Sequence, residues 1–81
     1  MIFPSQVRAA RGLLGWSQTE LSRRAGLGLA TVKRIESSTK ELRVNVQTLV
    51  RVKRALEAAG IIFIDQDEMR GPGVRWRKPL P

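Results

Sequence analysis

Two short helices with almost no chain between them are the sequence feature that most constrains the fold. Ser17 and Glu20 have the spacing of a capping box, in which a hydroxyl and a carboxylate satisfy the free amides of a helix start. That helix is predicted to reach about Ala25. Gly26 follows where a helix ends in a left-handed residue, a conformation that glycine adopts without steric cost. A second helix is predicted from about Leu29 to Glu36. The sequence therefore predicts two short helices that a glycine turn joins.

Helices are also predicted before and after this pair. Ser5 is a candidate cap for a first helix that reaches about Leu13. Asn45 is a candidate cap for a last helix that reaches Ala59, where Gly60 stops it. In both helices, apolar residues recur at the spacing that places them on one face: Val7, Ala10 and Leu14 in the first, and Val46, Leu49, Val52 and Leu56 in the last. Residues 1–60 are therefore predicted to form a helical domain.

The segment after Gly60 has the pattern of a β-hairpin. Residues 61–64 are a short β-branched and aromatic run, residues 71–73 are a Gly-Pro-Gly turn signal, and residues 74–77 alternate in polarity. An isolated hairpin is marginally stable in water, so it must pack on the helices or pair with another chain. We predict a C-terminal hairpin and tail over residues 61–81.

The size and composition limit the chemistry that is open to the chain. Its 81 residues form one domain with a modest core, which leaves little room for a deep catalytic cleft. Histidine and cysteine are both absent, which excludes the commonest general base, zinc thiolate sites and disulfides. The few carboxylates are scattered at helix caps and turns. We therefore expect no enzyme, no metal site, no cofactor and no small-molecule ligand.

The net charge favours a polyanionic partner. Fifteen Lys and Arg against seven Asp and Glu give +8, which suits nucleic acid or anionic lipid, although solubility alone is the alternative reason. No apolar run approaches the roughly 20 residues that span a bilayer, and residues 1–4 lack the features of a signal peptide. We expect a cytoplasmic protein without a membrane partner.

The predicted helix from Leu29 to Glu36 has two distinct sides. At about 100 degrees per residue, Val32 and Ile35 point the same way and are candidates for the core. The opposite side carries short, polar and basic residues: Ala30, Lys33, Arg34 and Ser37. A solvated helix face is the alternative reading of the two charged residues.

Those residue types suit the DNA major groove, which the second helix of a helix-turn-helix enters. Arg34 can bind guanine O6 and N7 together, Lys33 can reach a guanine or a phosphate, and Ala30 can contact a thymine methyl. Leu29 is either a core residue or a second contact to thymine. The predicted base-reading residues are Leu29, Ala30, Thr31, Lys33 and Arg34.

The sequence resembles the phage repressor and Cro type helix-turn-helix regulators, also called the xenobiotic-response-element group. Three segments carry the resemblance, which covers roughly Val7 to Leu56: residues 7–11 (VRAAR), 16–26 (WSQTELSRRAG) and 31–36 (TVKRIE). The resemblance implies a mainly α, four- to five-helix repressor-like domain, here with the short C-terminal β-hairpin. It also implies core positions at Leu14, Leu21, Ala25, Val32, Ile35 and Leu49.

The resemblance further implies roles for polar residues. Gln18 matches a phosphate-binding glutamine at a helix start, and Arg11 and Glu36 match a structural salt bridge. The implied phosphate-binding residues are Gln18, Ser37, Ser38, Thr39, Lys40 and Arg43. The chain departs from the family's frequent Asn-Gly at residues 37–38. It also departs at residues 28–30, where Gly-Leu-Ala replaces residues that bind bases, so we expect DNA shape to contribute to recognition.

The charges of the hairpin are segregated. Residues 61–69 hold three acids and no Lys or Arg, whereas residues 70–81 hold four basic residues and no acid. This asymmetry suggests pairing between two copies through the strand edge formed by Ile61, Ile62, Phe63 and Ile64. One alternative is a hairpin folded on its own helices with Trp76 over the core. Another is that Arg75, Arg77 and Lys78 contact DNA phosphates.

We expect a homodimeric transcriptional regulator that binds double-stranded DNA, as a repressor or a controller of its own operon, and that associates with the nucleoid when bound. Each subunit is expected to read one half of an inverted repeat, with half-site centres about 34 Å apart. One alternative is an antitoxin or anti-regulator whose hairpin occupies a partner protein. The other is an excisionase-like factor that bends DNA.

Overall fold

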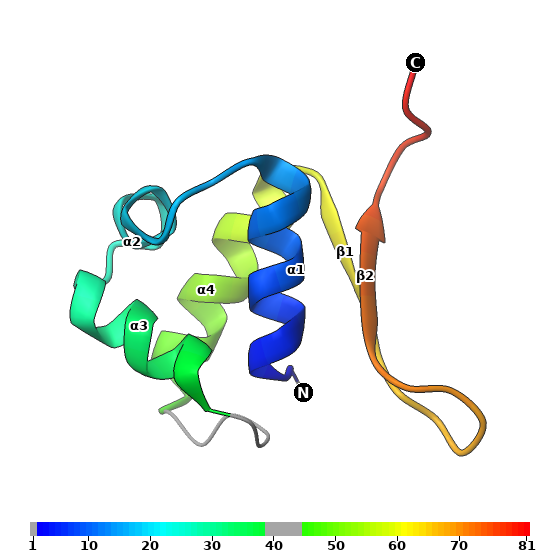
Figure 1. The fold of residues 1–81 in the computed structure, drawn as a ribbon, viewed down its shortest axis with the longest axis horizontal. Helices are drawn as coiled ribbons and strands as arrows, with labels where there is room; N and C mark the ends of the chain where they lie inside the picture. Colours follow the sequence, from blue (N-terminus) through cyan, green and yellow to red (C-terminus); the bar gives the residue numbers. More distant parts are fainter. Residues whose placement is uncertain (1, 39–44) are drawn as a thin grey trace.

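The structure is a computed structural model in which residues 2–38 and 45–81 are described. The described chain contains four helices and a two-stranded antiparallel sheet: α1 (Pro4–Leu14), α2 (Gln18–Ala25), α3 (Leu29–Ser37), α4 (Val46–Ala58), β1 (Ile61–Ile64) and β2 (Gly73–Trp76). The prediction of a mainly helical fold with a C-terminal hairpin is confirmed. Figure 1 shows α2 and α3 on one side of the molecule and the hairpin on the other, with α1 and α4 between them.

The start of α1 differs from the prediction. The helix begins at Pro4, whereas Ser5 was predicted to be its cap. Proline is well suited to the first helical position because its missing N–H has no helical partner there. The free amide of Phe3 is instead satisfied by the side chain of Gln6, whose Oε1 accepts it at 2.8 Å. Gly15 ends the helix with φ 68°, in the left-handed region.

The cap of α2 forms only half of the predicted capping box. Ser17 Oγ accepts the backbone N–H of Glu20 at 3.0 Å, as predicted. The carboxylate of Glu20 does not return to the cap, because it binds the guanidinium groups of Arg23 and Arg24 one turn along the helix. Gly26 ends α2 with φ 66°. Asn45 caps α4 as predicted, with Oδ1 accepting the N–H of Thr48 at 2.8 Å.

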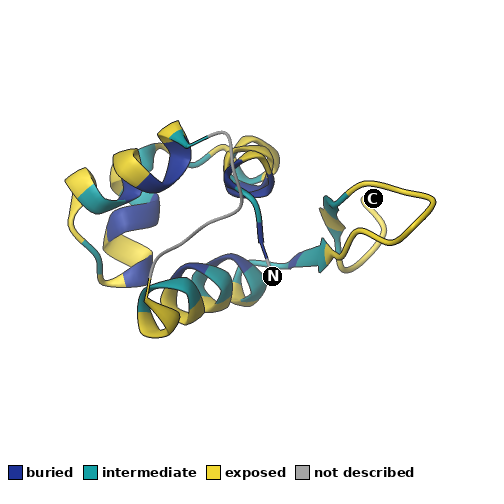
Figure 2. Ribbon diagram, turned by 90° about the horizontal axis from the view of Figure 1, so that it is seen from below, coloured by how far each residue is buried: buried dark blue, intermediate teal, exposed yellow. Residues whose placement is uncertain are grey.

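The core lies where the four helices meet the start of the hairpin. Its buried apolar residues are Ile2, Val7, Ala10, Leu21, Ala25, Val32, Ile35, Val52, Leu56 and Ile61. In Figure 2 the inward faces of the helices are buried, while the hairpin loop and the tail are exposed. Val46 was predicted to share one helix face with Leu49, Val52 and Leu56, but its side chain is 75% exposed. Val46 lies in the first turn of α4, to one side of the face that Val52 and Leu56 bury.

The hairpin packs against the helices. Its register pairs Ile61 with Trp76 and Ile64 with Gly73. Alternate residues face the core, so that Ile61 is buried and Phe63, Val74 and Trp76 are partly buried against it. β2 lies against α1 and β1 against α4.

One buried side chain fastens the hairpin to α1. Gln6 is 2% exposed, and its Nε2 donates to the carbonyl oxygens of Ile64 at 3.2 Å and Gly73 at 2.9 Å. At the other end of the strands, Arg77 Nη2 donates to the carbonyl of Glu57 in α4 at 2.7 Å. Side chains therefore tie the strands to the helices at both ends of the sheet.

The turn of the hairpin lies earlier in the chain than predicted. Gly73, predicted as part of the turn, is in β2 opposite Ile64. The loop is organised by Asp67, whose Oδ1 accepts the N–H groups of Met69 at 2.8 Å and Arg70 at 2.7 Å. Aspartate side chains close turns in this way by hydrogen bonding to the backbone two or three residues ahead.

Candidate DNA interface

The outward side of α3 is the candidate reading surface. Ala30, Lys33, Arg34 and Ser37 are exposed on it, whereas Val32, Ile35 and Glu36 on the opposite side are buried. Within the described residues, no ion pair or hydrogen bond engages the charged end of Lys33 or Arg34. Both cations are therefore available to an external partner.

The buried carboxylate of Glu36 joins three helices. Arg11 in α1 binds it through two parallel bonds, Nε to Oε2 at 2.7 Å and Nη2 to Oε1 at 2.7 Å. Gln18 at the start of α2 adds a bond from Nε2 to Oε1 at 3.2 Å. The hydrogen bond to Glu36 raises the pKa of Arg11 despite its partial desolvation. Such planar, two-bonded pairs fix orientation as well as position.

A second arginine of α1 holds the end of α3. The guanidinium of Arg8 donates to the backbone carbonyl of Glu36, in the last turn of the helix. A cation there is favourable because the carbonyl end of a helix carries partial negative charge. Arg11 also donates to the carbonyl of Trp16 at 2.9 Å, which ties the α1–α2 connection to the same cluster. The orientation of α3 is thus set by side chains of α1 and α2.

A helix-turn-helix family model matches residues 7–59. The chain belongs to the helix-turn-helix family of the phage repressor and Cro type. A search of curated proteins finds no match to the chain. The matched region contains α1 to α4 and ends just before the hairpin.

The other predicted residues of this helix-turn-helix lie around the reading surface. Leu29, at the first position of α3, is 36% exposed and lies outside the core cluster, and Thr31 is half-buried on the flank. Ser37 Oγ donates to the carbonyl of Arg34 at 3.0 Å, and Ser38 is half-buried. The phosphate-binding predictions at Thr39, Lys40 and Arg43 lie outside the described residues.

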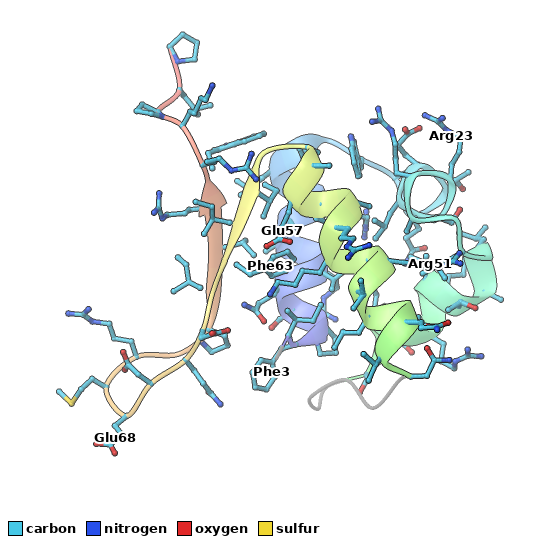
Figure 3. All side chains as sticks on the ribbon, turned by 180° about the vertical axis from the view of Figure 1, so that it is seen from behind. Phe3, Arg23, Arg51, Glu57, Phe63 and Glu68 are labelled. Atoms are coloured by element: carbon cyan, nitrogen blue, oxygen red, sulfur yellow. The ribbon has the colours of Figure 1, made fainter. Side chains whose placement is uncertain are left out.

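The turn of the motif has a contact that the sequence analysis missed. Arg51 in α4 donates from Nη1 to the carbonyl of Gly26 at 3.1 Å (Figure 3). This bond fixes the residue at which the chain leaves α2 for α3. No local pattern links residues 26 and 51, so nothing in the sequence signals it. Arg8 was also missed, although its position three residues before Arg11 places both on one side of α1.

Two arginines of α2, Arg23 and Arg24, contact neighbouring side chains rather than the reading surface. The Arg24 guanidinium lies over the ring of Trp16, 4.8 Å from its centre. Hydrogen bonds from Arg24, the larger cause, and from Arg23 lower the pKa of Glu20.

The described residues contain no group of three or more carboxylate, His or Cys side chains placed to hold a metal ion. None of the helices in that part of the chain is both long and apolar enough to cross a membrane.

Proposed function

We propose that the chain is a sequence-specific transcriptional regulator that binds double-stranded DNA as a homodimer, as a repressor or a controller of its own operon. Membership of the helix-turn-helix family supports DNA binding and a role in transcription regulation. The observation that carries the finer proposal is the outward side of α3, where Lys33 and Arg34 are exposed above the buried Val32 and Ile35. A helix anchored on one side and basic on the other suits insertion into the major groove.

Base reading is proposed for the residues on or beside this face: Leu29, Ala30, Thr31, Lys33 and Arg34. Arg34 has the geometry to donate two hydrogen bonds to one guanine, which is the commonest specific contact to DNA. Ala30 and Leu29 present only apolar surface, which suits thymine methyl groups. Because few side chains here bind bases by hydrogen bonds, sequence-dependent DNA shape is proposed to supply part of the specificity.

Phosphate contacts are proposed on both sides of α3. Gln18 lies at the first helical position of α2, where free backbone amides attract an anion. Its Nε2 is directed to Glu36, which holds the side chain beside the N-terminal end of the helix. Ser37 ends α3 and Ser38 follows it. For Thr39, Lys40 and Arg43 the proposal rests on the sequence. These contacts set the register of the protein on the duplex but carry no sequence information.

Dimerisation is proposed through the outer edge of the hairpin, over residues 61–64. The sheet has two strands, so each strand has one edge without a partner strand in the described chain. Such an edge can pair with a copy of itself about a twofold axis. Ile61 faces the core and would take part through its backbone, whereas Ile64 is 40% exposed and would add side-chain contact. Ile64→Lys is the direct test: it should weaken dimerisation in sedimentation, because charge on an edge strand blocks pairing.

The test of the DNA proposal is a footprint on the DNA upstream of the protein's own gene. A homodimer should protect an inverted repeat whose half-site centres are about 34 Å apart. Arg34→Ala should weaken specific binding by about 1 to 3 kcal/mol and relax preference at one base pair. Arg75→Ala is the matched control, because it removes the same charge from β2, on the opposite side of the molecule from α3. It should leave the preference unchanged.

Two results would contradict the proposal. The first is that Arg34→Ala and Arg75→Ala both weaken binding to all DNA sequences equally, which would indicate unspecific attraction of DNA to a basic protein. The second is a protected region without twofold symmetry, which would remove the homodimer and the inverted repeat.

A further inference from the structure

Met69 and Val46 are the two most exposed large apolar side chains among the described residues. Met69 in the hairpin loop is 88% exposed, and Val46 at the start of α4 is 75% exposed. They lie on separate elements, and each has a distinct charged environment. Exposed apolar groups with a defined charged rim mark interaction sites more often than scattered ones do.

Val46 belongs to a groove on the outer side of α4. The groove has a volume of about 310 Å³ and is lined by Val46, Gln47, Val50, Arg51 and Arg54. This side is opposite the face that packs into the core. α4 carries no acid before Glu57, which lies near its other end (Figure 3). The α4 groove is therefore apolar at one side and basic at the other.

Met69 belongs to a hairpin tip of opposite charge. The tip, residues 65–70, holds Asp65, Asp67 and Glu68 against the single cation Arg70, and all of its residues are exposed. The two hydrogen bonds that Asp67 accepts from Met69 and Arg70 give the tip a fixed turn. Met69 is thus presented on a preorganised acidic loop, which lowers the entropic cost of docking.

The tip does not lie against the groove of its own chain. It projects away from all four helices in Figures 1 and 2, and Figure 3 shows Glu68 at its far end. The bonds of Gln6 to Ile64 and Gly73 fix the two strand residues from which the tip projects. An occupant of the groove with the complementary charge must therefore come from another molecule.

We propose that the hairpin tip of one copy of the chain docks in the α4 groove of a second copy. Met69 packs on Val46 and Val50, and the carboxylates of the tip face Arg51 and Arg54. Burial of Met69 on docking provides the attraction. The opposite charges of the tip and the groove select the orientation and disfavour other partners. The high charge of the chain as a whole opposes unspecific association, so the segregated charges are needed for two copies to meet.

This contact joins two unlike surfaces, in contrast to pairing between two equal strand edges. When the tip of one copy docks in the groove of another, the first copy keeps a free groove and the second a free tip. Unless the two copies fill each other's grooves, the contact can therefore link successive molecules. Neighbouring copies on one DNA would then bind cooperatively. The contact itself requires no DNA, so it can be tested separately from the proposed regulatory function.

The test is sedimentation of the intact protein without DNA, from micromolar to millimolar concentration. Glu68→Lys and Arg54→Glu alone should each weaken self-association at least tenfold, and an equimolar mixture of the two variants should associate again. Met69→Ser should also weaken it tenfold or more, without a change in charge. Glu57→Gln is the control on α4 and should have no effect. Asp67 and Arg51 are left intact because they hold the tip and the turn of the motif.

The outcomes separate the contact from the other proposals. Ile64→Lys should leave the effects of Glu68→Lys and Met69→Ser in place, since it changes only the strand edge. Met69→Ser, which leaves the charge unchanged, should bind a DNA fragment with a single half-site as the unchanged protein does. A protein that stays monomeric over the whole range, or whose association is the same in Glu68→Lys, Arg54→Glu and Met69→Ser, would overturn the proposal.

Discussion

Gln6 in α1 donates a hydrogen bond of 2.9 Å to the carbonyl of Gly73 in β2, across 67 positions of the chain. The same Nε2 also binds Ile64, and the Oε1 accepts the amide of Phe3. Both polar atoms of the Gln6 side chain therefore have hydrogen-bond partners, and the residue is only 2% exposed. One side chain thus connects the helix start, both strands and the core.

Replacement of Gln6 should destabilise the fold. Gln6→Leu keeps the approximate volume but removes three hydrogen bonds and leaves buried polar groups with fewer partners. We expect a loss of about 2 kcal/mol in the free energy of unfolding, measured by urea denaturation. Gln66→Leu is the control, because Gln66 is exposed in the hairpin loop. A loss for Gln6→Leu no larger than that of the control would contradict the anchoring role.

The Arg11–Glu36 pair should depend on both partners. Arg11→Met leaves a carboxylate that is 3% exposed with Gln18 as its remaining side-chain partner, so we expect a loss of about 3 kcal/mol in urea unfolding. Adding Glu36→Leu removes the uncompensated charge and should recover most of that loss. A double variant as unstable as Arg11→Met would contradict this explanation. Arg23→Ala, at a solvent-exposed pair, should have a much smaller effect than Arg11→Met.

Alanine should have opposite effects at two exposed glycines. Gly26 has φ +66°, and an added Cβ would meet Arg51 Nη1 at 3.4 Å, so Gly26→Ala should destabilise by about 1 to 2 kcal/mol. Gly12 lies within α1 with no atom within 4 Å of an added Cβ. Gly12→Ala should therefore stabilise by about 0.5 to 1 kcal/mol. Thermal unfolding measures both, and equal signs would contradict the conformational argument.

The carboxyl of Glu20 should titrate below its ordinary pKa of 4.5. Its hydrogen bond to Arg24, the larger cause, and its hydrogen bond to Arg23 favour the charged carboxylate. Because the folded-state pKa is lowered, the stabilising contribution is present above pH 4.5 and is lost as the pH falls through the folded-state pKa. Arg24→Gln should raise the pKa more than Arg23→Gln, measured by carboxyl NMR titration. An unchanged pKa in both variants would show that the two pairs do not persist in solution.

Local signals in the sequence predicted the helices well. Ser17 and Asn45 cap the helices that they were expected to cap, and Gly26 has the expected left-handed conformation. Each of these features depends on hydrogen bonds within a few residues, so each leaves a recognisable pattern. The division of α3 into a buried and an exposed side was predictable for the same reason, since it follows from helical periodicity.

Long-range contacts account for part of what was not predicted, and competing local contacts account for the rest. The roles of Gln6 and Arg51 depend on residues brought close by the fold, and neither residue stands out in its neighbourhood. The hairpin turn was misplaced because an aspartate closes it, where a Gly-Pro-Gly run suggested otherwise. Glu20 was assigned to the cap, but two arginines further along α2 compete for its carboxylate.

The separation of α3 from the hairpin by α1 and α4 has a practical consequence (Figure 1). A dye, bead or fused domain attached at the hairpin side, for example at the exposed Pro81, leaves the basic helix uncovered. The molecule can therefore be immobilised or tracked by one end while the other engages a duplex, and occupancy at the two ends can be recorded at the same time.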